Sequence, residues 1–314
     1  MQTILITGGT GLVGSALTKL LVAKGYQVII LSRKTRPAEG AVSYAEWDPA
    51  KGTIDLKALQ AADCIVHLAG ANVGEKRWTK KRKQEIIDSR VQSGELIAQS
   101  LKSHPNKVRA VISASAIGWY GDDKLRPKEK SNFTENDPAD SAYLGETCRK
   151  WEDAIQPVSA LGKRLVILRT GIVLSPEGGA LPSFQKPIKL GIASILGSGR
   201  QVISWIHIDD IARLYLFAIE NESLQGIFNA VAPQPVTNEN LVLTLAKLMK
   251  GRFYIPINVP SFLLKLILGE MSIEVLKSAT VSSAKVSRSG FQFLYPTLLQ
   301  GLINQTAKQT APGE

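Results

Sequence analysis

The stretch that decides the fold is Ile4-Leu5-Ile6-Thr7-Gly8-Gly9-Thr10-Gly11-Leu12-Val13-Gly14, near the start of the chain. Its first four residues are typical of a short buried strand, and from Leu12 to Leu21 the apolar residues recur at helical spacing. The glycines fit two spacings, G-x-G-x-x-G from Gly9 and G-x-x-G-x-x-G from Gly8. Because a strand precedes these glycines and a helix follows them, the motif predicts a turn that binds a dinucleotide.

Each glycine of this turn has a physical task. The first allows a turn that side chains forbid, Gly11 lets the backbone touch a pyrophosphate, and Gly14 lets the helix pack closely on the strand. The start of the helix offers free N–H groups and a partial positive charge to the phosphates. We therefore expect the cofactor to contact Gly8, Gly11, Leu12, Val13 and Gly14.

Apolar runs alternate with amphipathic stretches along most of the chain. The strand-like runs are 28–31, 42–47, 64–70, 108–113 and 165–169, and helical patterns cover 12–21, 79–101 and 141–161. This alternation predicts parallel strands joined by right-handed crossovers, and strands that are apolar throughout indicate a sheet covered on both faces. We predict an α/β fold, a Rossmann-type doubly wound parallel sheet.

The composition changes after residue 170, since glycines and prolines are frequent between residues 178 and 199. We expect residues 1–170, joined by a segment at about 202–231, to form the dinucleotide-binding domain. Residues 171–201 and 232–314 are expected to form a smaller C-terminal α+β substrate domain. The cleft between the two domains should lie beyond the carboxyl ends of the strands.

The charge balance narrows the set of partners. The 314 residues include 38 Lys and Arg against 27 Asp and Glu, a formal net charge of +11, which favours anionic ligands. The densest basic stretch, Lys76 to Lys83, is interpreted either as the solvated start of a helix or as a rim that attracts a phosphorylated substrate. Zinc-finger and RNP signatures are absent, so we expect a small-molecule substrate and no specific nucleic-acid partner.

Cysteine and histidine usage excludes other classes. Cys64 and Cys148 are too few for a disulfide framework and fit reduced thiols, so we expect a cytoplasmic protein. The three histidines and two cysteines lack metal-ligand spacing, so no metal is expected. The chain has no run of eighteen apolar residues, and we expect no membrane partner. The sequence leaves the oligomeric state open.

Several motifs resemble those of the extended, epimerase-like branch of the short-chain dehydrogenase/reductase superfamily. They are Thr7–Gly14, His67–Gly70, Ser113–Ala116 and Trp205–Asp210. A second set resembles one atypical subfamily, whose members are named epimerase family proteins or nucleoside-diphosphate-sugar epimerases: Ser32–Lys34, Ser89-Arg90, Cys148 with Trp151-Glu152, Asn229–Pro233 and Thr237-Asn238. The resemblance implies a small C-terminal domain of unknown function at about 250–300. It specifies the fold and the cofactor class but no substrate.

The end of the second strand bears on the choice of cofactor. An acidic residue there would bind the ribose 2′-hydroxyl and favour NAD, but this chain has Ser32-Arg33-Lys34. Arg33 offers a forked donor and Ser32 a hydroxyl to a 2′-phosphate. We therefore expect NADP in preference to NAD. The alternative is that Arg33 and Lys34 are surface charges that follow a strand.

The superfamily pattern implies further cofactor contacts on two strand ends and one helix: Asp48, Leu68, Ala69, Gly70, Glu85 and Arg90. Asp48 stands where the superfamily places an acid beside the adenine, although Asp48-Pro49 equally fits a turn. Leu68 to Gly70 should pass under the adenosine. Arg90 is interpreted either as a phosphate contact or as half of a structural salt bridge.

The catalytic pattern of the superfamily is incomplete here. A tyrosine phenol, with a pKa of about 10, needs a nearby cation to exchange protons at neutral pH, and in the superfamily a lysine four residues later supplies it. The best-placed tyrosine is Tyr143, but the residue at i+4 is Thr147. The candidate catalytic residues are Tyr143 and Ser115. Ser115 is either a hydrogen-bond partner of a substrate oxygen or a small residue that allows close packing.

These observations predict an NADP(H)-dependent oxidoreductase or epimerase that acts on a small substrate, nucleotide-linked substrates included. The missing lysine supports an alternative from another class, a non-catalytic or weakly catalytic NADP(H)-binding regulator. Because some members of the subfamily are labelled cell-division-inhibitor-like, the resemblance connects this alternative with cell division.

Overall fold

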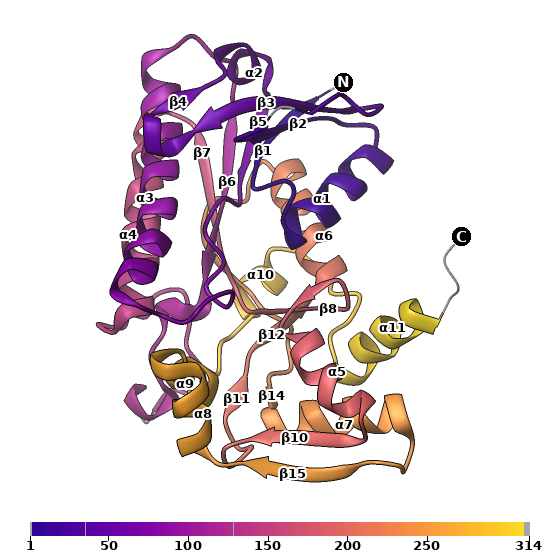
Figure 1. Ribbon diagram of the computed structural model, residues 1–314. Coiled ribbons are helices and arrows are strands. Elements are labelled where there is room, and N and C mark those ends of the chain that lie inside the picture. The colour runs from indigo at the N-terminus through magenta and orange to yellow at the C-terminus, as the bar shows by residue number, and fades with distance from the viewer. Residues whose placement is uncertain (1, 35, 128, 311–314) are drawn as a thin grey trace.

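Eight strands form one large sheet in the computed structural model, which describes residues 2–34, 36–127 and 129–310 (Figure 1). In spatial order they are β13 (Gly226–Ala230), β7 (Arg164–Thr170), β6 (Ala110–Ala116), β5 (Cys64–His67), β1 (Thr3–Thr7), β2 (Gln27–Ser32), β3 (Val42–Asp48) and β4 (Thr53–Ile54). All neighbours pair in parallel except β4, which runs antiparallel to β3. The predicted Rossmann-type α/β fold is confirmed, and its order reverses between β1 and β5, where such sheets bind ligands.

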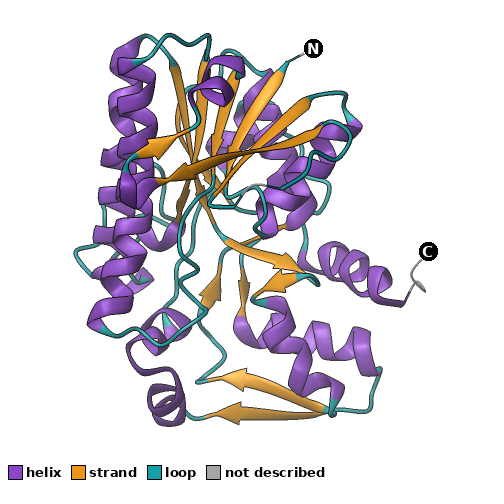
Figure 2. Cartoon of the chain, turned by 45° about the horizontal axis from the view of Figure 1, so that its top comes forward, coloured by secondary structure: helices purple, strands orange, loops and turns teal. Residues whose placement is uncertain are grey.

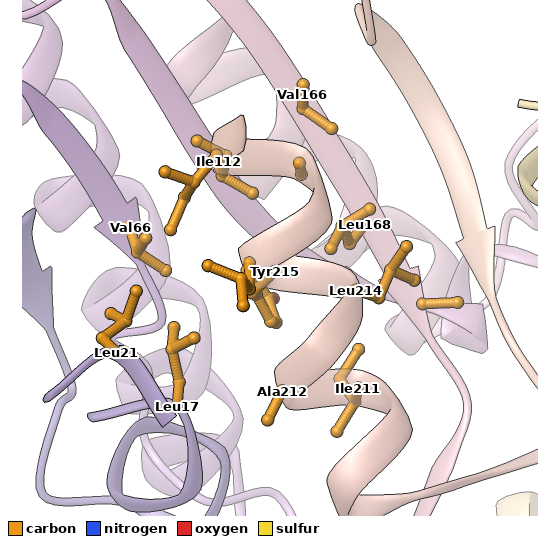
Figure 3. Packing of buried hydrophobic residues seen from close by; sticks show 14 of the residues in the cluster. Leu17, Leu21, Val66, Ile112, Val166, Leu168, Ile211, Ala212, Leu214 and Tyr215 are labelled. Carbon is orange, nitrogen blue, oxygen red and sulfur yellow. The ribbon is translucent and has the colours of Figure 1, made fainter. Parts of the chain in front are cut away.

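Both faces of the large sheet are covered by helices. In β1, Ile4 and Ile6 face one side and Leu5 the other, as the two-residue period of a strand requires, and all three are fully buried. The first face packs on α1 (Leu12–Ala23) and α6 (Ile208–Glu220), as Figure 3 shows. The second packs on α2 (Leu56–Ala61), α3 (Lys80–Ser103) and α4 (Tyr143–Ile155). This double cover accounts for the continuously apolar strands.

Smaller sheets and helices form the C-terminal part (Figure 2). The strands are β8 (Ile172–Ser175), β9 (Gly178–Gly179), β10 (Ile192–Leu196), β11 (Val202–Ile203), β12 (Trp205–His207), β14 (Val236–Thr237) and β15 (Ile255–Val259). The helices are α5 (Leu181–Lys189), α7 (Asn238–Lys250), α8 (Ser261–Leu268), α9 (Ser272–Leu276) and α11 (Leu298–Thr310). Helix α10 (Ala284–Arg288) also lies late in the chain but packs on β13 of the large sheet. Trp205 is fully buried in the core that α5, α7 and α11 share. Short 3-10 helices are η1 (Pro49–Lys51), η2 (Ile117–Trp119), η3 (Asp123–Leu125), η4 (Gln156–Leu161) and η5 (Gly269–Met271).

The segment at about 202–231, which the sequence assigns to the dinucleotide-binding domain, is divided between the two parts. Strand β13 is part of the large sheet and helix α6 packs on it, whereas β11 pairs with β14 and β12 pairs with β8 in the smaller sheets. Residues 311–314, at the end of the expected substrate domain, lie outside the described residues. The helices expected over 79–101 and 141–161 correspond to α3 and to α4 followed by η4.

Candidate dinucleotide site

The glycine turn follows β1 at the point where the strand order reverses. Gly8 has a φ of +68°, in the left-handed region that favours glycine. A Cβ on Gly8 would lie 2.9 Å from the carbonyl of Leu68, and a Cβ on Gly14 would lie 2.4 Å from the carbonyl oxygen of Gly8. Both positions therefore need glycine for the packing of the protein itself.

Gly11 differs from the other two glycines because its surroundings leave space. It is exposed and has φ −79° and ψ 176°, a conformation that any residue adopts. Apart from its chain neighbours, the only described atom within 4 Å of a Cβ built there is the Gly8 carbonyl oxygen, at 3.3 Å. Gly11 makes no side-chain cap, so among the described residues the first N–H groups of α1, from Leu12 and Val13, remain for a phosphate. The turn therefore fits a dinucleotide pyrophosphate.

A buried hydrogen-bond cluster joins the glycine turn to the end of β5. Thr7 Oγ1 lies 2.8 Å from His67 Nδ1. The same oxygen accepts hydrogen bonds from the N–H groups of Leu68 at 3.1 Å and Ala69 at 3.2 Å. Burial, and to a smaller extent the charge of Arg90, lowers the pKa of His67 to about 3, so the imidazole is neutral. The cluster places two of the predicted cofactor-binding segments side by side.

The turn after β2 lies next to the glycine turn, because β2 is the neighbour of β1 in the sheet. Arg33 and Lys34 are exposed there, and the Lys34 N–H donates to Ser32 Oγ at 3.3 Å. Among the described residues, neither Arg33 nor Lys34 forms an ion pair. The guanidinium of Arg33 is therefore accessible to an anionic ligand.

Two of the predicted cofactor contacts are engaged with neighbouring residues. Asp48 caps η1 by accepting from the Ala50 N–H at 3.1 Å, so it forms the turn that was the alternative interpretation. Glu85 is exposed on α3 and pairs with Arg82 at 2.8 Å. No hydrogen bond or ion pair among the described residues joins Asp48 or Glu85 to the glycine turn.

Arg90 packs beneath the chain that follows β5. Its Nη1 donates to the carbonyls of Ala71 and Ile86, both at 3.0 Å, and its guanidinium lies 4.7 Å from the ring centre of Trp151. A Cβ on Gly70 would lie 3.0 Å from Arg90 Cζ, so the chain passes closely over the guanidinium. The charge of Arg90 is thus held by carbonyls and an aromatic ring rather than by a carboxylate of the described residues.

The predicted catalytic tyrosine lies between α4 and α3. Tyr143 donates its hydroxyl to the Lys83 carbonyl at 3.1 Å, and its ring packs edge-on against Trp78 at 4.9 Å between centres. Burial raises the pKa of Tyr143 above its ordinary value. Thr147, at i+4, is buried and donates to the Tyr143 carbonyl at 2.7 Å. The phenol is therefore a weaker acid than in solution.

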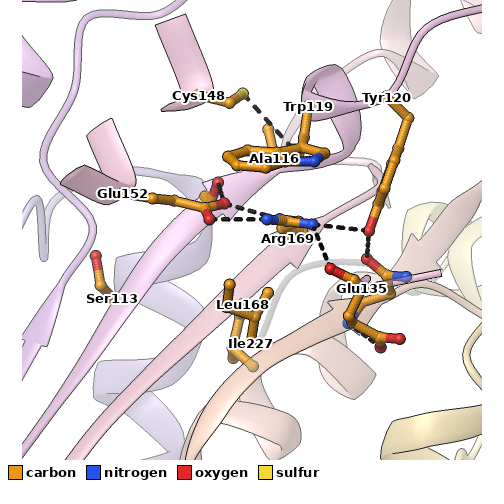
Figure 4. A network of polar contacts seen from close by, with 12 residues as sticks. Ser113, Ala116, Trp119, Tyr120, Glu135, Cys148, Glu152, Leu168, Arg169 and Ile227 are labelled. Carbon is orange, nitrogen blue, oxygen red and sulfur yellow. Dashed lines mark hydrogen bonds and ion pairs between the residues drawn. The ribbon is translucent and has the colours of Figure 1, made fainter. Parts of the chain in front are cut away.

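The predicted catalytic serine belongs to a buried polar network, in which Figure 4 shows Glu152, Arg169 and Tyr120. Ser115 is 2% exposed and donates to Glu152 Oε1 at 2.6 Å. Glu152 pairs with both Nε and Nη2 of Arg169, at 2.8 and 2.9 Å. Arg169 also donates to the Tyr120 hydroxyl at 3.1 Å, and its guanidinium lies 3.6 Å from the ring centre of Trp119. Ser115 could donate a proton to a substrate oxygen only if its bond to Glu152 opened.

The same network ties the large sheet to the C-terminal part. Tyr120 donates to Asn229 Oδ1 at 2.7 Å, and Asn229 Nδ2 donates to the Ser282 carbonyl at 3.2 Å. Burial opposes the charge of Arg169, yet the bonds to Glu152 hold the Arg169 pKa above its ordinary value. Sequence reasoning did not single out Arg169 or Asn229 as site residues. The available signal was a charged residue, Arg169, directly after the apolar run Leu165–Leu168.

Other features of the structure lie away from these loops. A cavity of about 720 Å³ opens at the opposite edge of the sheet, and its lining includes Lys24, Asp63, Arg109 and Arg164. Within the described ranges, no helix has the length and apolar character that crossing a bilayer demands. The described His, Cys, Asp and Glu side chains form no group of three that could hold a metal ion.

A Rossmann-type sheet with a complete glycine turn at its switch point defines a class, the dinucleotide-binding α/β proteins. Comparison with known proteins narrows this class. The sequence model of the NAD dependent epimerase/dehydratase family matches residues 4–230, and that of a domain of unknown function (DUF1731) matches residues 259–304. The chain belongs to the NAD dependent epimerase/dehydratase family, which confirms the resemblance seen in its motifs.

Two bacterial relatives match over at least 95% of their length. An epimerase family protein of Staphylococcus aureus is 38% identical over 309 residues, which cover 98% of this chain and 100% of the relative. The epimerase family protein YfhF of Bacillus subtilis is 35% identical over 298 residues, 95% of each chain. The similarity therefore extends over both parts of this chain.

Solved structures share the fold. The human epimerase family protein SDR39U1 (isoform 2), crystallised with NADPH, has a TM-score of 0.85 and 29% identity, covering 99% of this chain and 100% of that chain. The nucleoside-diphosphate sugar epimerase of Corynebacterium glutamicum has a TM-score of 0.75 and 32% identity, covering 97% of this chain and 57% of that chain. UDP-glucuronic acid 4-epimerase of Bacillus cereus, solved with UDP-glucuronic acid and NAD, has a TM-score of 0.77 over 98% of this chain and 100% of that chain, and at 20% identity it supports the fold alone.

Proposed function

We propose that this chain binds NADP(H) and catalyses the oxidoreduction or epimerisation of a small substrate, nucleotide-linked substrates included. The observation that carries the proposal is the exposed backbone of Gly11 at the start of α1, beside a turn in which Arg33 and Lys34 are exposed. A pyrophosphate against Gly11 lies next to helix N–H groups, and a 2′-phosphate at the end of β2 meets a guanidinium. The similarity to SDR39U1, which was crystallised with NADPH, supports the same cofactor.

Replacing one arginine tests the choice of cofactor. Arg33→Ala should weaken NADPH binding by about 1–3 kcal/mol, the usual cost of losing a hydrogen bond to a charged group, and should leave NADH binding nearly unchanged. The matched control is Arg109→Ala, since Arg109 is also an exposed arginine (62%) but lies at the opposite edge of the sheet. Titration calorimetry measures both affinities. Equal affinities of the parent chain for NADPH and NADH would contradict the proposal.

The nicotinamide supplies hydride transfer, and the chain has to orient the substrate and exchange a proton with its reacting oxygen. Tyr143 and Ser115 are the proposed residues for that proton. Neither hydroxyl is free in the structure, since Tyr143 is bonded to the Lys83 carbonyl and Ser115 to Glu152. The proposed catalysis therefore includes a rearrangement of at least one of these bonds when substrate binds.

The engaged hydroxyls favour a second candidate, an NADP(H)-binding regulator with little or no turnover. A partly buried phenol with a raised pKa and no lysine at i+4 is a poor proton donor. Absorbance of NADPH in the presence of a panel of carbonyl compounds and nucleotide sugars distinguishes the two candidates. Substrate-dependent loss of absorbance supports the enzyme, whereas tight NADPH binding with constant absorbance across the panel supports the regulator.

A further inference from the structure

The C-terminal part carries an apolar surface that no described residue covers. Four side chains of α8 are exposed, Phe262 by 72%, Leu263 by 36%, Leu266 by 70% and Ile267 by 58%. Leu264 is the only buried residue of this helix, which packs chiefly on η5 and α9. We call these four side chains the α8 ridge. Exposed apolar patches of this kind mark sites of interaction.

Basic residues lie directly beside the α8 ridge. Arg77 Nη2 donates to the carbonyl of Leu266 at 3.1 Å, and Lys83 pairs with Glu270, just after the helix, at 2.6 Å. These contacts bring the basic stretch 76–83 against the end of α8, and Figure 1 shows α8 below the start of α3. Three lysines of the stretch are exposed and form no ion pair with any described residue: Lys76, Lys80 and Lys81.

The geometry disfavours two other occupants of this surface. A second copy could add a strand to the edge of β15, but Ile255 and Val259 bond towards β10, so Pro256 lies on the free edge. Proline has no N–H to donate and blocks such pairing. A second copy packed on the ridge would also bring two basic stretches together. An amphipathic peptide binds in an apolar groove, whereas the side chains of the α8 ridge point away from η5 and α9, on which the helix packs.

We propose that the α8 ridge and the basic stretch 76–83 together dock this chain on an anionic lipid surface. A projecting apolar helix can enter the boundary between headgroups and acyl chains, because that phase yields around it. The exposed lysines then meet anionic headgroups at the same surface. Docking of this kind needs no membrane-spanning helix. The proposal therefore replaces the expectation of no membrane partner, which rested on the absence of an apolar run long enough to span a membrane.

Vesicle co-sedimentation of the full chain tests the proposal. The vesicles are phosphatidylglycerol with phosphatidylcholine in equal parts, and phosphatidylcholine alone. We expect the parent chain to bind the anionic vesicles and to be released by high salt. Leu266→Glu should lower the bound fraction at least tenfold, and Lys80→Glu with Lys81→Glu should do the same. The matched control is Leu299→Glu on α11, a leucine that is 51% exposed on another helix, which should bind like the parent.

Two kinds of result would overturn the proposal. One is equal binding of the parent and Leu266→Glu to anionic vesicles, or no binding by either. The other is a dimer of the parent in solution, seen by light scattering, that Leu266→Glu dissociates, because the ridge would then hold a second copy. NADPH affinity, which Leu266→Glu should not change, is measured in parallel to show that each variant is folded. A failure of docking therefore leaves the cofactor proposal independently testable.

Discussion

Alanine at Gly14 should destabilise the fold, whereas alanine at Gly11 should mainly weaken the binding of NADPH. Gly14→Ala puts a Cβ 2.4 Å from the Gly8 carbonyl oxygen and 2.6 Å from the Gly9 Cα. Both are backbone atoms, so the helix or the turn has to move, and overpacking of this kind costs about 1–3 kcal/mol of unfolding free energy. Gly11→Ala meets one atom at 3.3 Å in an ordinary conformation. The Gly8 carbonyl oxygen has to shift by a few tenths of an ångström, so we expect a cost to the fold of about 1 kcal/mol, that of alanine in place of glycine at a helix N-cap.

At Gly11 the main effect of a substitution should be a loss of NADPH affinity. A methyl group there occupies the space assigned to the pyrophosphate, so NADPH affinity should fall at least tenfold, about 1.4 kcal/mol, and the bulkier Gly11→Val should abolish binding. Urea denaturation gives the unfolding free energy of each variant, and calorimetry gives its NADPH affinity. A folded Gly11→Ala or Gly11→Val chain with the parent's NADPH affinity would refute the assigned site. An unchanged stability of Gly14→Ala would refute the packing argument.

Three further predictions concern the polar side chains of His67, Glu152 and Tyr143. His67 has a pKa of about 3 when folded and about 6.5 when unfolded. Below pH 6.5 the unfolded chain therefore binds a proton that the folded chain does not. The free energy of unfolding should decrease as the pH is lowered from about 6.5 to about 3. His67→Gln should remove about 2 kcal/mol of the loss between pH 7 and pH 5 in urea denaturation, and an unchanged loss would contradict the assignment. Glu152→Gln leaves the charge of Arg169, which is 1% exposed, uncompensated, and should lower the unfolding free energy by about 3–5 kcal/mol. A loss well below that range would show that water reaches the guanidinium. Tyr143→Phe should lower any NADPH turnover by less than about tenfold, since general acid catalysis by an effective donor contributes about 10²–10⁴. A larger loss would show that the phenol is activated by a group not identified above.

The fold could be predicted from the sequence because its signals are local. The glycine turn, the apolar strands and the helical spacing each occupy one short segment, and parallel strands with covered faces allow few arrangements. The Thr79 cap of α3, which accepts from the Arg82 N–H at 3.1 Å, is local in the same sense. Such features depend little on what the rest of the chain does.

The site could be predicted only in part because several of its contacts join distant segments. The sequence allows Arg90 to be a phosphate contact or half of a structural salt bridge, and in the structure its guanidinium lies against Trp151 from α4 and donates to the carbonyl of Ala71. The sequence allows Ser115 to bind a substrate oxygen or to allow close packing, and in the structure Glu152, 37 residues later, accepts its hydrogen bond. The contacts with Trp151 and Glu152 cannot be inferred from spacing, since they depend on how α4 packs against α3 and β6.

The most direct test of the cofactor site is a crystal structure of the full chain grown with NADPH. We predict density for the pyrophosphate against Gly11 and the start of α1, and for the 2′-phosphate beside the guanidinium of Arg33. Density for NADPH at another place, such as the cavity lined by Arg109 and Arg164 at the opposite edge of the sheet, would contradict the assignment. So would a 2′-phosphate that points away from Arg33 into solvent.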